Sequence, residues 1–157
     1  MGTIDLERSD PDFVKELARQ PGGESISACF ACRSCVAGCP ISAINREFSP
    51  AKIIRMVLYG LKEEILKNDF IWLCSTCYTC QERCPQGVSI TELMTLLKNM
   101  AVKEGYAPAG IWTQMKLVKG EGRIYPIDDF DNKKRDKAGL PRLSTSCGEI
   151  KELFQQE

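Results

Sequence analysis

Eight of the nine cysteines of this 157-residue chain stand in two runs that share one spacing. In each run, three cysteines are separated by two residues each, and a fourth follows after three more residues, directly before a proline. A 4Fe–4S cluster needs four thiolates, and three closely spaced cysteines can wrap one loop around three of its corners. The sequence therefore predicts two 4Fe–4S clusters. The predicted metal ligands are Cys29, Cys32, Cys35, Cys39, Cys74, Cys77, Cys80 and Cys84.

The fourth cysteine of each run lies beyond the cluster that the first three would hold. In two-cluster ferredoxins with this spacing, that cysteine ligates the other cluster. The same logic predicts crossed ligands, which would tie the two loops together and bring the clusters close enough for sequential electron transfer. Cluster 1 is then assigned Cys29, Cys32, Cys35 and Cys84, and cluster 2 is assigned Cys74, Cys77, Cys80 and Cys39.

Zinc sites and disulfides explain these cysteines less well. Zinc sites generally combine pairs of cysteines, often with histidine, and this chain contains no histidine. Disulfides would require eight crowded thiols to pair without strain. The first 20 residues are charged and lack the continuous apolar stretch of an export signal. We therefore expect reduced thiols and a cytoplasmic protein.

Polar residues beside the cysteines allow two interpretations. Arg33 and Arg83 could offset the negative charge of the clusters. The hydroxyl groups of Ser75, Thr76 and Thr79 could donate hydrogen bonds to cluster sulfurs and tune their potentials. All five residues could equally belong to a solvated loop surface.

Three further residues could take part in redox chemistry. Cys147, outside both runs, could be a reactive thiol at the start of a predicted helix, although an inert small residue is the simpler interpretation. Trp72 and Trp112 are better explained by packing than by electron relay.

Composition excludes several classes of function. Basic and acidic residues are equal at 21 each, so the net charge is zero and nothing indicates binding to nucleic acid. No segment approaches the roughly 18 apolar residues of a membrane span, so we expect no direct insertion into a membrane. Apolar residues make up 43% of the chain, which is enough for a modest core.

The second run repeats the first 45 positions later, and a helix signal follows each run. After the first, Ser49 is a natural N-cap, Pro50 suits the first helical position, and apolar residues recur at helical spacing up to an early stop at Gly60. After the second, Ser89 and Glu92 match a capping box, which predicts a helix that ends at Gly105.

Further helices are predicted at Asp12–Arg19, Lys62–Lys67 and Ala109–Lys119, and a capping box at Ser146 and Glu149 predicts a terminal helix through Phe154. No alternating strand pattern is present, so we expect a mostly helical fold with the cysteine runs as irregular loops.

Two segments, Phe48–Met56 and Trp72–Pro85, carry a resemblance to a known family. Together with the helix that follows the second run, they closely resemble the C subunit of heterodisulfide reductase, and the similarity extends from Asp12 to Val118. The resemblance implies a mostly α fold, an α-helical ferredoxin-like domain with two 4Fe–4S cluster-binding loops. One departure is Arg33, where many relatives have glycine, and it bears on the backbone geometry of the first run and on the potential of its cluster.

The chain then divides into three parts: an N-terminal helix or arm over residues 1–20, the α-helical ferredoxin domain over residues 21–119, and an extended C-terminal arm with a short terminal helix over residues 120–157. Within the arm, Gly120–Ser144 mixes Gly, Pro, Asp and Lys without apolar periodicity.

Members of this family relay electrons from an A-type partner, which bears flavin and iron–sulfur clusters, to a catalytic B-type partner with CCG repeats. In methanogens, the B-type partner reduces the heterodisulfide of coenzyme M and coenzyme B; other relatives serve other anaerobic complexes. The resemblance therefore implies an electron-relay subunit that has no catalytic residue of its own and that binds A-like and B-like partners. A free-standing ferredoxin-like carrier, or the cluster subunit of an enzyme of the fumarate reductase or glycolate oxidase type, is the alternative; the long arm favours the relay subunit.

Overall fold

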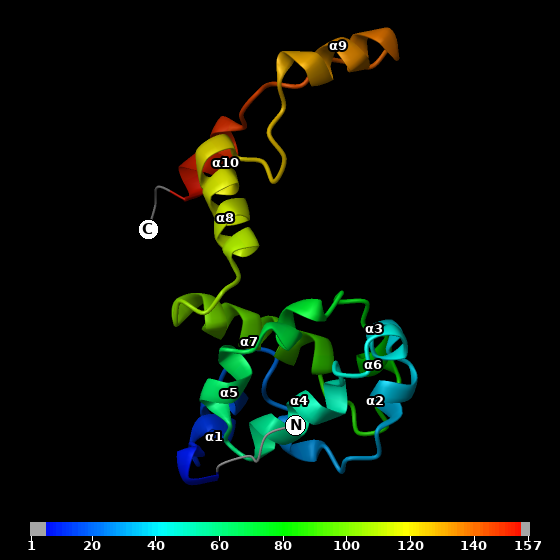
Figure 1. The fold of residues 1–157 in the computed structure, drawn as a ribbon, viewed down its shortest axis with the longest axis vertical. Helices are drawn as coiled ribbons and strands as arrows, with labels where there is room; N and C mark the ends of the chain where they lie inside the picture. Colours follow the sequence, from blue (N-terminus) through cyan, green and yellow to red (C-terminus); the bar gives the residue numbers. More distant parts are fainter. Residues whose placement is uncertain (1–5, 155–157) are drawn as a thin grey trace. The chain divides into compact units, whose positions relative to one another are not determined.

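The computed structural model describes residues 6–154, and these residues form helices and loops without a β-strand (Figure 1). The prediction of a mostly α fold is confirmed. The chain divides into two compact units, the first ending at Ala107 and the second beginning at Pro108. Of the predicted N-terminal part, residues 1–5 lie outside the described residues. No helix in the described part is both long and apolar enough to cross a membrane.

The described part of the first unit contains seven α-helices and three short 3-10 helices. In chain order these are η1 Leu6–Arg8, α1 Phe13–Ala18, η2 Ile26–Ala28, α2 Ser34–Ala37, α3 Pro40–Ile44, α4 Pro50–Leu58, α5 Lys62–Leu66, η3 Asp69–Leu73, α6 Thr79–Glu82 and α7 Ile90–Lys103. The helices of the second unit are α8 Ala109–Glu121, α9 Asp129–Lys137 and α10 Gly148–Leu153.

The core of the first unit forms where α1, α4, α5 and α7 bury their apolar faces. On α4, Ile53, Ile54 and Val57 are at most 1% exposed, because their spacing places them on one side of the helix. Leu93 and Leu97 occupy the same kind of position on α7. α1, α5 and α8 form where the sequence predicted helices.

The turn between α4 and α5 depends on Gly60. Its φ is +70°, and a Cβ at this position would come within 2.2 Å of the carbonyl oxygen of Asp10. The amide of Asp10 donates to the carbonyl oxygen of Gly60 at 2.8 Å, which brings the segment before α1 against the turn. A residue without a side chain is therefore required here, and the predicted early stop of α4 is confirmed.

The start of α4 follows its sequence signal. The hydroxyl of Ser49 accepts a hydrogen bond from the amide of Lys52 at 3.3 Å, and Pro50 occupies the first helical position. The N-cap prediction is confirmed, because every group that forms this cap lies within four consecutive residues.

The start of α7 differs from its sequence signal. Ser89 precedes the helix, but its side chain makes no capping hydrogen bond, so the predicted capping box with Glu92 is wrong. The hydroxyl of Ser25 instead accepts from the amide of Ser89 at 2.9 Å. The side-chain oxygen of Gln81 accepts from the amide of Thr91 at 3.1 Å. Partners from two other segments therefore replace the local cap.

The sequence led us to expect an extended arm between α8 and α10. This segment instead contains a helix, α9. Asp128 and Asp131 form the capping box of this helix, each side chain accepting from the backbone amide of the other. Asn132, within α9, makes two hydrogen bonds of 2.9 Å with the backbone of Leu143, which holds the chain that follows the helix against α9.

α10 also begins differently from its prediction. Cys147 precedes the helix and no side chain caps it, so the predicted capping box of Ser146 and Glu149 is wrong. Instead, the amide of Cys147 donates to the carbonyl oxygen of Glu121 at the end of α8 at 2.9 Å. The start of α10 is therefore fixed by its contact with α8.

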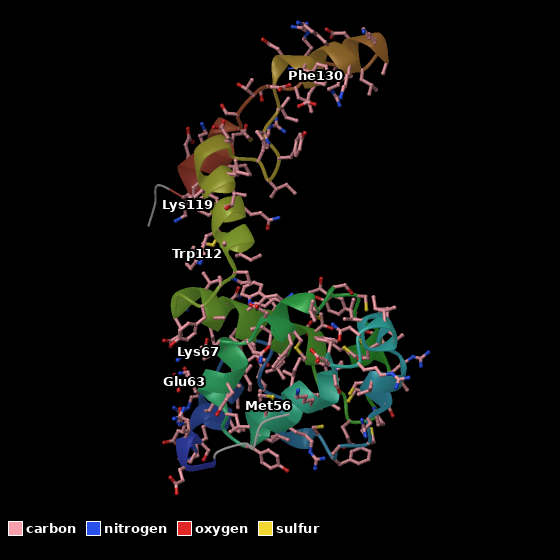
Figure 2. The ribbon with its side chains drawn as sticks, in the orientation of Figure 1. Met56, Glu63, Lys67, Trp112, Lys119 and Phe130 are labelled. Carbon is pink, nitrogen blue, oxygen red and sulfur yellow. The ribbon has the colours of Figure 1, made fainter. Side chains whose placement is uncertain are left out.

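The second unit lacks a core of large apolar residues. Asn132 is its only buried residue among those described, whereas Ile124 is 75% and Phe130 is 62% exposed. Figure 2 labels Phe130 on α9, where Lys134 lies 4.2 Å from the centre of its ring. The apolar side chains of the second unit are therefore available for contact with another protein.

Candidate metal centres

The two cysteine runs adopt the same backbone conformation. Among the described residues, four non-glycine residues have a positive φ, and they occupy equivalent positions on either side of the second cysteine of each run. These are Ala31 at 63° and Arg33 at 65° in the first run, and Thr76 at 53° and Tyr78 at 62° in the second. Such conformations are unfavourable for residues with a Cβ and concentrate at functional sites. The sequence repeat is thus also a structural repeat.

Arg33 does not distort the first loop. It has the left-handed conformation that glycine would adopt easily, and Tyr78 has a similar conformation at the equivalent position of the second run. Arg33 therefore adds a charged side chain beside the first cavity, while the backbone there has the same conformation as in the second run.

A short helix carries the third cysteine of each run. α2 begins directly after Arg33 and carries Cys35, whereas α6 begins directly after Tyr78 and carries Cys80. Both of these cysteines are buried, at 8% and 9% exposed. The sequence led us to expect loops here, because four-residue helices leave no periodic signal.

The first cavity is lined by three cysteines of the first run and one of the second, namely Cys29, Cys32, Cys35 and Cys84. Ala51 and Ile54 of α4 and Ile90 of α7 complete its apolar wall. Arg33 also lines this cavity, but its side chain is exposed to solvent.

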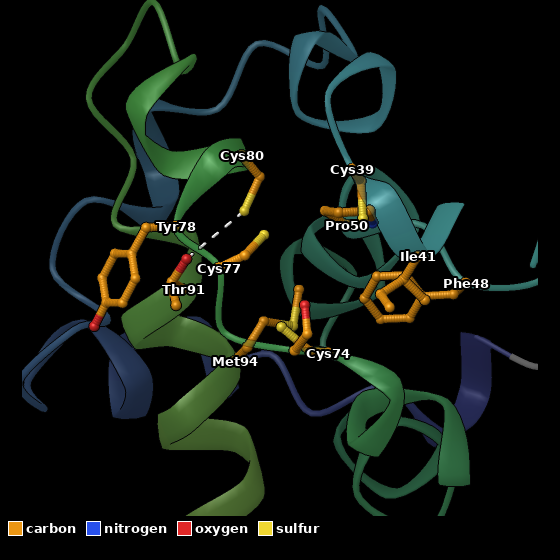
Figure 3. A pocket seen from close by; sticks show the side chains of 11 residues that line it. Cys39, Ile41, Phe48, Pro50, Cys74, Cys77, Tyr78, Cys80, Thr91 and Met94 are labelled. Carbon is orange, nitrogen blue, oxygen red and sulfur yellow. Dashed lines mark hydrogen bonds between the residues drawn. The ribbon is translucent and has the colours of Figure 1, made fainter. Parts of the chain in front are cut away.

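The second cavity is lined by the complementary set, Cys74, Cys77, Cys80 and Cys39 (Figure 3). Phe48 and Pro50 lie on one side of it, and Thr91 and Met94 of α7 on the other. Each cavity thus contains the set of four thiols that crossed ligation requires.

Hydrogen bonds to the sulfur atoms follow the repeat. In the first run, the sulfur of Cys32 lies 3.3 Å from the hydroxyl oxygen of Ser34. At the equivalent positions of the second run, the sulfur of Cys77 lies 3.5 Å from the hydroxyl oxygen of Thr79. The fourth cysteine of each run accepts a backbone hydrogen bond, Cys39 at 3.4 Å and Cys84 at 3.3 Å.

The polar residues considered from the sequence have different surroundings. Thr79 contacts a cysteine, but the hydroxyl of Thr76 donates to the backbone carbonyl of Ser75 at 2.7 Å. Arg83 packs over Gly38, where an added Cβ would come within 2.7 Å of its Cδ. Trp72 packs against the core, as expected.

Cys147 and Trp112 lie in the second unit, and neither lines a cysteine cavity. Cys147 is the N-cap residue of α10, so it lies at a helix start as the sequence predicted. Whether it is a reactive thiol or an inert residue stays open.

α7 supplies two contacts to cysteines of the second set that the sequence did not predict. The hydroxyl of Thr91, which is 1% exposed, lies 3.7 Å from the sulfur of Cys80. Lys98 donates from its ammonium group to the carbonyl oxygen of Cys74 at 2.9 Å. Both partners lie at least ten residues away in sequence, so local patterns gave no signal for either contact.

Burial controls the protonation of the inner thiols. Burial raises the pKa of Cys35 to about 11, and the nearby thiols of Cys80 and Cys29 raise it further. Burial also raises the pKa of Cys80, against the lowering effect of the Thr91 hydroxyl. A hydrogen bond with Ser34 lowers the pKa of the exposed Cys32. Without bound metal the inner sulfurs therefore hold their protons, and ligation must release them.

The arrangement of the thiols fits a cluster. The cysteines of each set line one space between them. Four cysteines around each cavity match the four ligand positions of a 4Fe–4S cluster.

Comparison with known proteins agrees with this chemistry. A family model described as a 4Fe-4S dicluster domain matches residues 25–88, which include all eight cysteines of the two runs. The chain is 34% identical to the iron-sulfur C subunit of the CoB–CoM heterodisulfide reductase of Methanopyrus kandleri, over 96% of this chain and 81% of that protein. The chain therefore binds two 4Fe–4S clusters.

Two further relatives come from other archaea. The C subunit of the H2:CoB-CoM heterodisulfide, ferredoxin reductase of Methanothermobacter thermautotrophicus is 35% identical over 99% of this chain and 80% of its own length. The second iron-sulfur C subunit of the CoB–CoM heterodisulfide reductase of Methanocaldococcus jannaschii is 36% identical over 94% of this chain and 82% of its own length. In each case the similarity extends well beyond the cysteine runs.

Proposed function

Because this chain belongs to the family of the C subunit of heterodisulfide reductase, an iron–sulfur electron-transfer protein, we propose that it connects two partner subunits. It takes electrons from an A-like subunit with flavin and iron–sulfur centres and passes them to a B-like subunit with CCG repeats. The B-like subunit then reduces a disulfide, such as that of coenzyme M and coenzyme B.

The observation that carries this proposal is the composition of the two cavities. Each is lined by three cysteines of one run and the fourth of the other, so one folded unit carries two complete ligand sets. We assign the first cluster to Cys29, Cys32, Cys35 and Cys84, and the second to Cys74, Cys77, Cys80 and Cys39. Removing either run would take ligands from both sites, so the two centres form together.

The ligand sets also favour a relay over a catalyst. Four thiols per cavity are enough to occupy every corner of a cluster, which leaves no corner for a substrate. A 4Fe–4S cluster supplies one-electron transfer, whereas reduction of a disulfide needs two electrons. The role of the protein is therefore to bind and position the two centres, and the chemistry of the disulfide belongs to the partner.

The second unit supports attachment to a larger complex. Its described residues bury no large apolar side chain, and Ile124, Phe130 and Leu153 are each more than 60% exposed. A carrier that diffuses freely gains nothing from such a surface, whereas a member of a complex can bury it against a neighbour.

Purification of the complex under anaerobic conditions tests the assignment. The expected result is co-purification with one A-like and one B-like chain in a fixed ratio through successive columns and in the presence of salt. A monomeric chain, recovered without either partner at every stage, would identify a free-standing carrier instead.

A further inference from the structure

The repeat of the two cysteine runs provides an internal control for the surroundings of the two clusters. Hydroxyl groups at equivalent positions contact Cys32 and Cys77, and backbone amides donate to Cys39 and Cys84. These contacts therefore act alike on both sites. Any difference between the clusters must arise from contacts that the repeat does not duplicate.

Ser75 is one such difference, because its side chain hydrogen-bonds Cys77 where the first run has Phe30. Two more contacts reach cysteines of the second set from α7. The hydroxyl of Thr91 lies 3.7 Å from Cys80, and the ammonium group of Lys98 lies 2.9 Å from the carbonyl oxygen of Cys74 (Figure 3 shows the first of these). Thr91 is 1% exposed, and Gln81 fixes its backbone by accepting from its amide at 3.1 Å. The hydroxyl is therefore buried and held in place beside the sulfur.

The first cavity has apolar side chains instead. Cys35 is equivalent to Cys80, but within residues 6–154 no side chain makes a hydrogen bond to it. The residues that α4 and α7 place there are Ala51, Ile54 and Ile90. Arg33 carries the one nearby positive charge of this lining, and its exposure to solvent screens that charge.

We propose that Thr91 and Lys98 give the second cluster a higher reduction potential than the first, so that an electron in this protein rests on the second cluster. The proposal rests on the assignment of Cys74, Cys77, Cys80 and Cys39 to one cluster. A hydroxyl that donates to a ligating thiolate, and a cation beside its backbone, both stabilise the additional negative charge of the reduced state. The effect of the Thr91 hydroxyl is the stronger of the two, because Thr91 is buried, where the dielectric constant is low.

Replacement of the hydroxyl by a methyl group tests the proposal directly. In Thr91→Val the volume and branching are kept, and the potential of the second cluster is expected to fall while that of the first is unchanged. The expected decrease is about threefold to tenfold in the equilibrium constant for reduction, and tenfold corresponds to about 59 mV for a one-electron centre. Thr91→Ser retains the hydroxyl and should restore the potential.

The matched control is Thr95→Val, on the next turn of the same helix. The hydroxyl of Thr95 donates to the backbone carbonyl of Thr91 at 3.1 Å and contacts no cysteine. Its removal should leave both potentials unchanged. An equal shift in Thr91→Val and Thr95→Val would overturn the proposal, because it would indicate a general effect on α7.

A second variant keeps the test decisive if Thr91→Val loses its cluster. Lys98→Met should lower the potential of the same cluster, Lys98→Arg should preserve it, and Lys103→Met, at the exposed end of α7, is the control. Unchanged potentials in Lys98→Met, and in Thr91→Val where that variant retains about eight irons, would refute the proposal.

The readout is a redox titration monitored by electron paramagnetic resonance on the purified, cluster-loaded chain. Cys39→Ala and Cys84→Ala identify the signal of each cluster, since under crossed ligation each removes a ligand from one site. No partner protein is needed, so the result is independent of the relay function: a free carrier with the predicted potentials would contradict the proposed function and still support this inference.

Discussion

Gly38 and Arg83 occupy the same position in the two cysteine runs, directly before the fourth cysteine, and they lie against each other. A Cβ at Gly38 would come within 2.7 Å of the Cδ of Arg83 and within 3.2 Å of a methyl group of Thr79. Contact between equivalent residues means that the runs meet face to face, at α2 and α6. There is room for one long side chain at this contact, and Arg83 provides it.

This contact predicts a non-additive pair of mutations. Gly38→Ala should destabilise the cluster-loaded protein by about 1 kcal/mol, because the new methyl group must displace the stem of Arg83. Arg83→Ala, at an exposed residue, should cost less than about 0.5 kcal/mol. The double variant should lose less stability than the sum of the two single variants, because the closest obstacle to the methyl group is gone and only the tight contact with Thr79 remains. The midpoint of thermal denaturation measures all three, and strictly additive shifts would contradict the packing described.

The iron content follows from the two ligand sets. Anaerobically purified protein should contain about eight irons and about eight acid-labile sulfides per chain. Bound zinc in place of iron, or an iron content of about four per chain, would contradict the prediction of two clusters. The Cys147→Ser variant is the natural control, because Cys147 lines neither cavity and its removal should leave the iron content unchanged.

Crossed ligation predicts which spectrum each mutation changes. Cys39→Ala should perturb the cluster held by Cys74, Cys77 and Cys80, although Cys39 belongs to the other run. Mössbauer or paramagnetic resonance spectra of the variant check this, with Cys84→Ala as the reciprocal experiment. If each mutation affected only the cluster of its own run, each run would be a self-contained site.

The second unit should be ordered by its partners. Backbone amides of α8, α9 and α10 are expected to exchange rapidly with deuterium in the isolated chain and slowly in the complex, because these helices bury almost no apolar surface of their own. α7 serves as the control, since its buried side chains should protect it in both states. Equal protection of the second unit in both states would show that it folds without a partner.

The sequence predicted features whose partners are near one another in the chain. Ser49 caps α4 because Lys52 lies three residues away. The grouping of the cysteines around the two cavities agrees with the pattern of two-cluster ferredoxins, and the crossed ligation itself stays a prediction. Ser89 fails as a cap because Ser25 and Gln81 satisfy the amides at this end of α7.

Two further features had weaker or no local signals. α9 was missed because its capping box uses Asp131 at the position where Glu or Gln is the recognised signal. Thr91 could not be assigned to Cys80, because that contact requires knowledge of how α7 packs against α6. The residues that form the cavities were thus predictable from sequence, whereas those that distinguish one cavity from the other were not.

The last prediction is that this chain alone reduces no disulfide. Each cavity presents four thiols, so both ligand sets are complete without a substrate, and Cys147 lies in the other unit. Cys35 and Cys80 are moreover buried, at 8% and 9% exposed, so a disulfide in solution has little access to their sulfurs.

Purified chain mixed with reduced viologen and the heterodisulfide of coenzyme M and coenzyme B should therefore oxidise no viologen beyond the amount needed to reduce its own clusters. Addition of the B-like partner should start steady oxidation, and the Cys39→Ala variant should slow it, because under crossed ligation that variant loses a ligand of the second cluster. The B-like partner without this chain provides the control for direct reduction by viologen. Steady turnover by the chain alone, lost on removal of its clusters, would refute the relay assignment, because the catalytic site would then lie within these 157 residues.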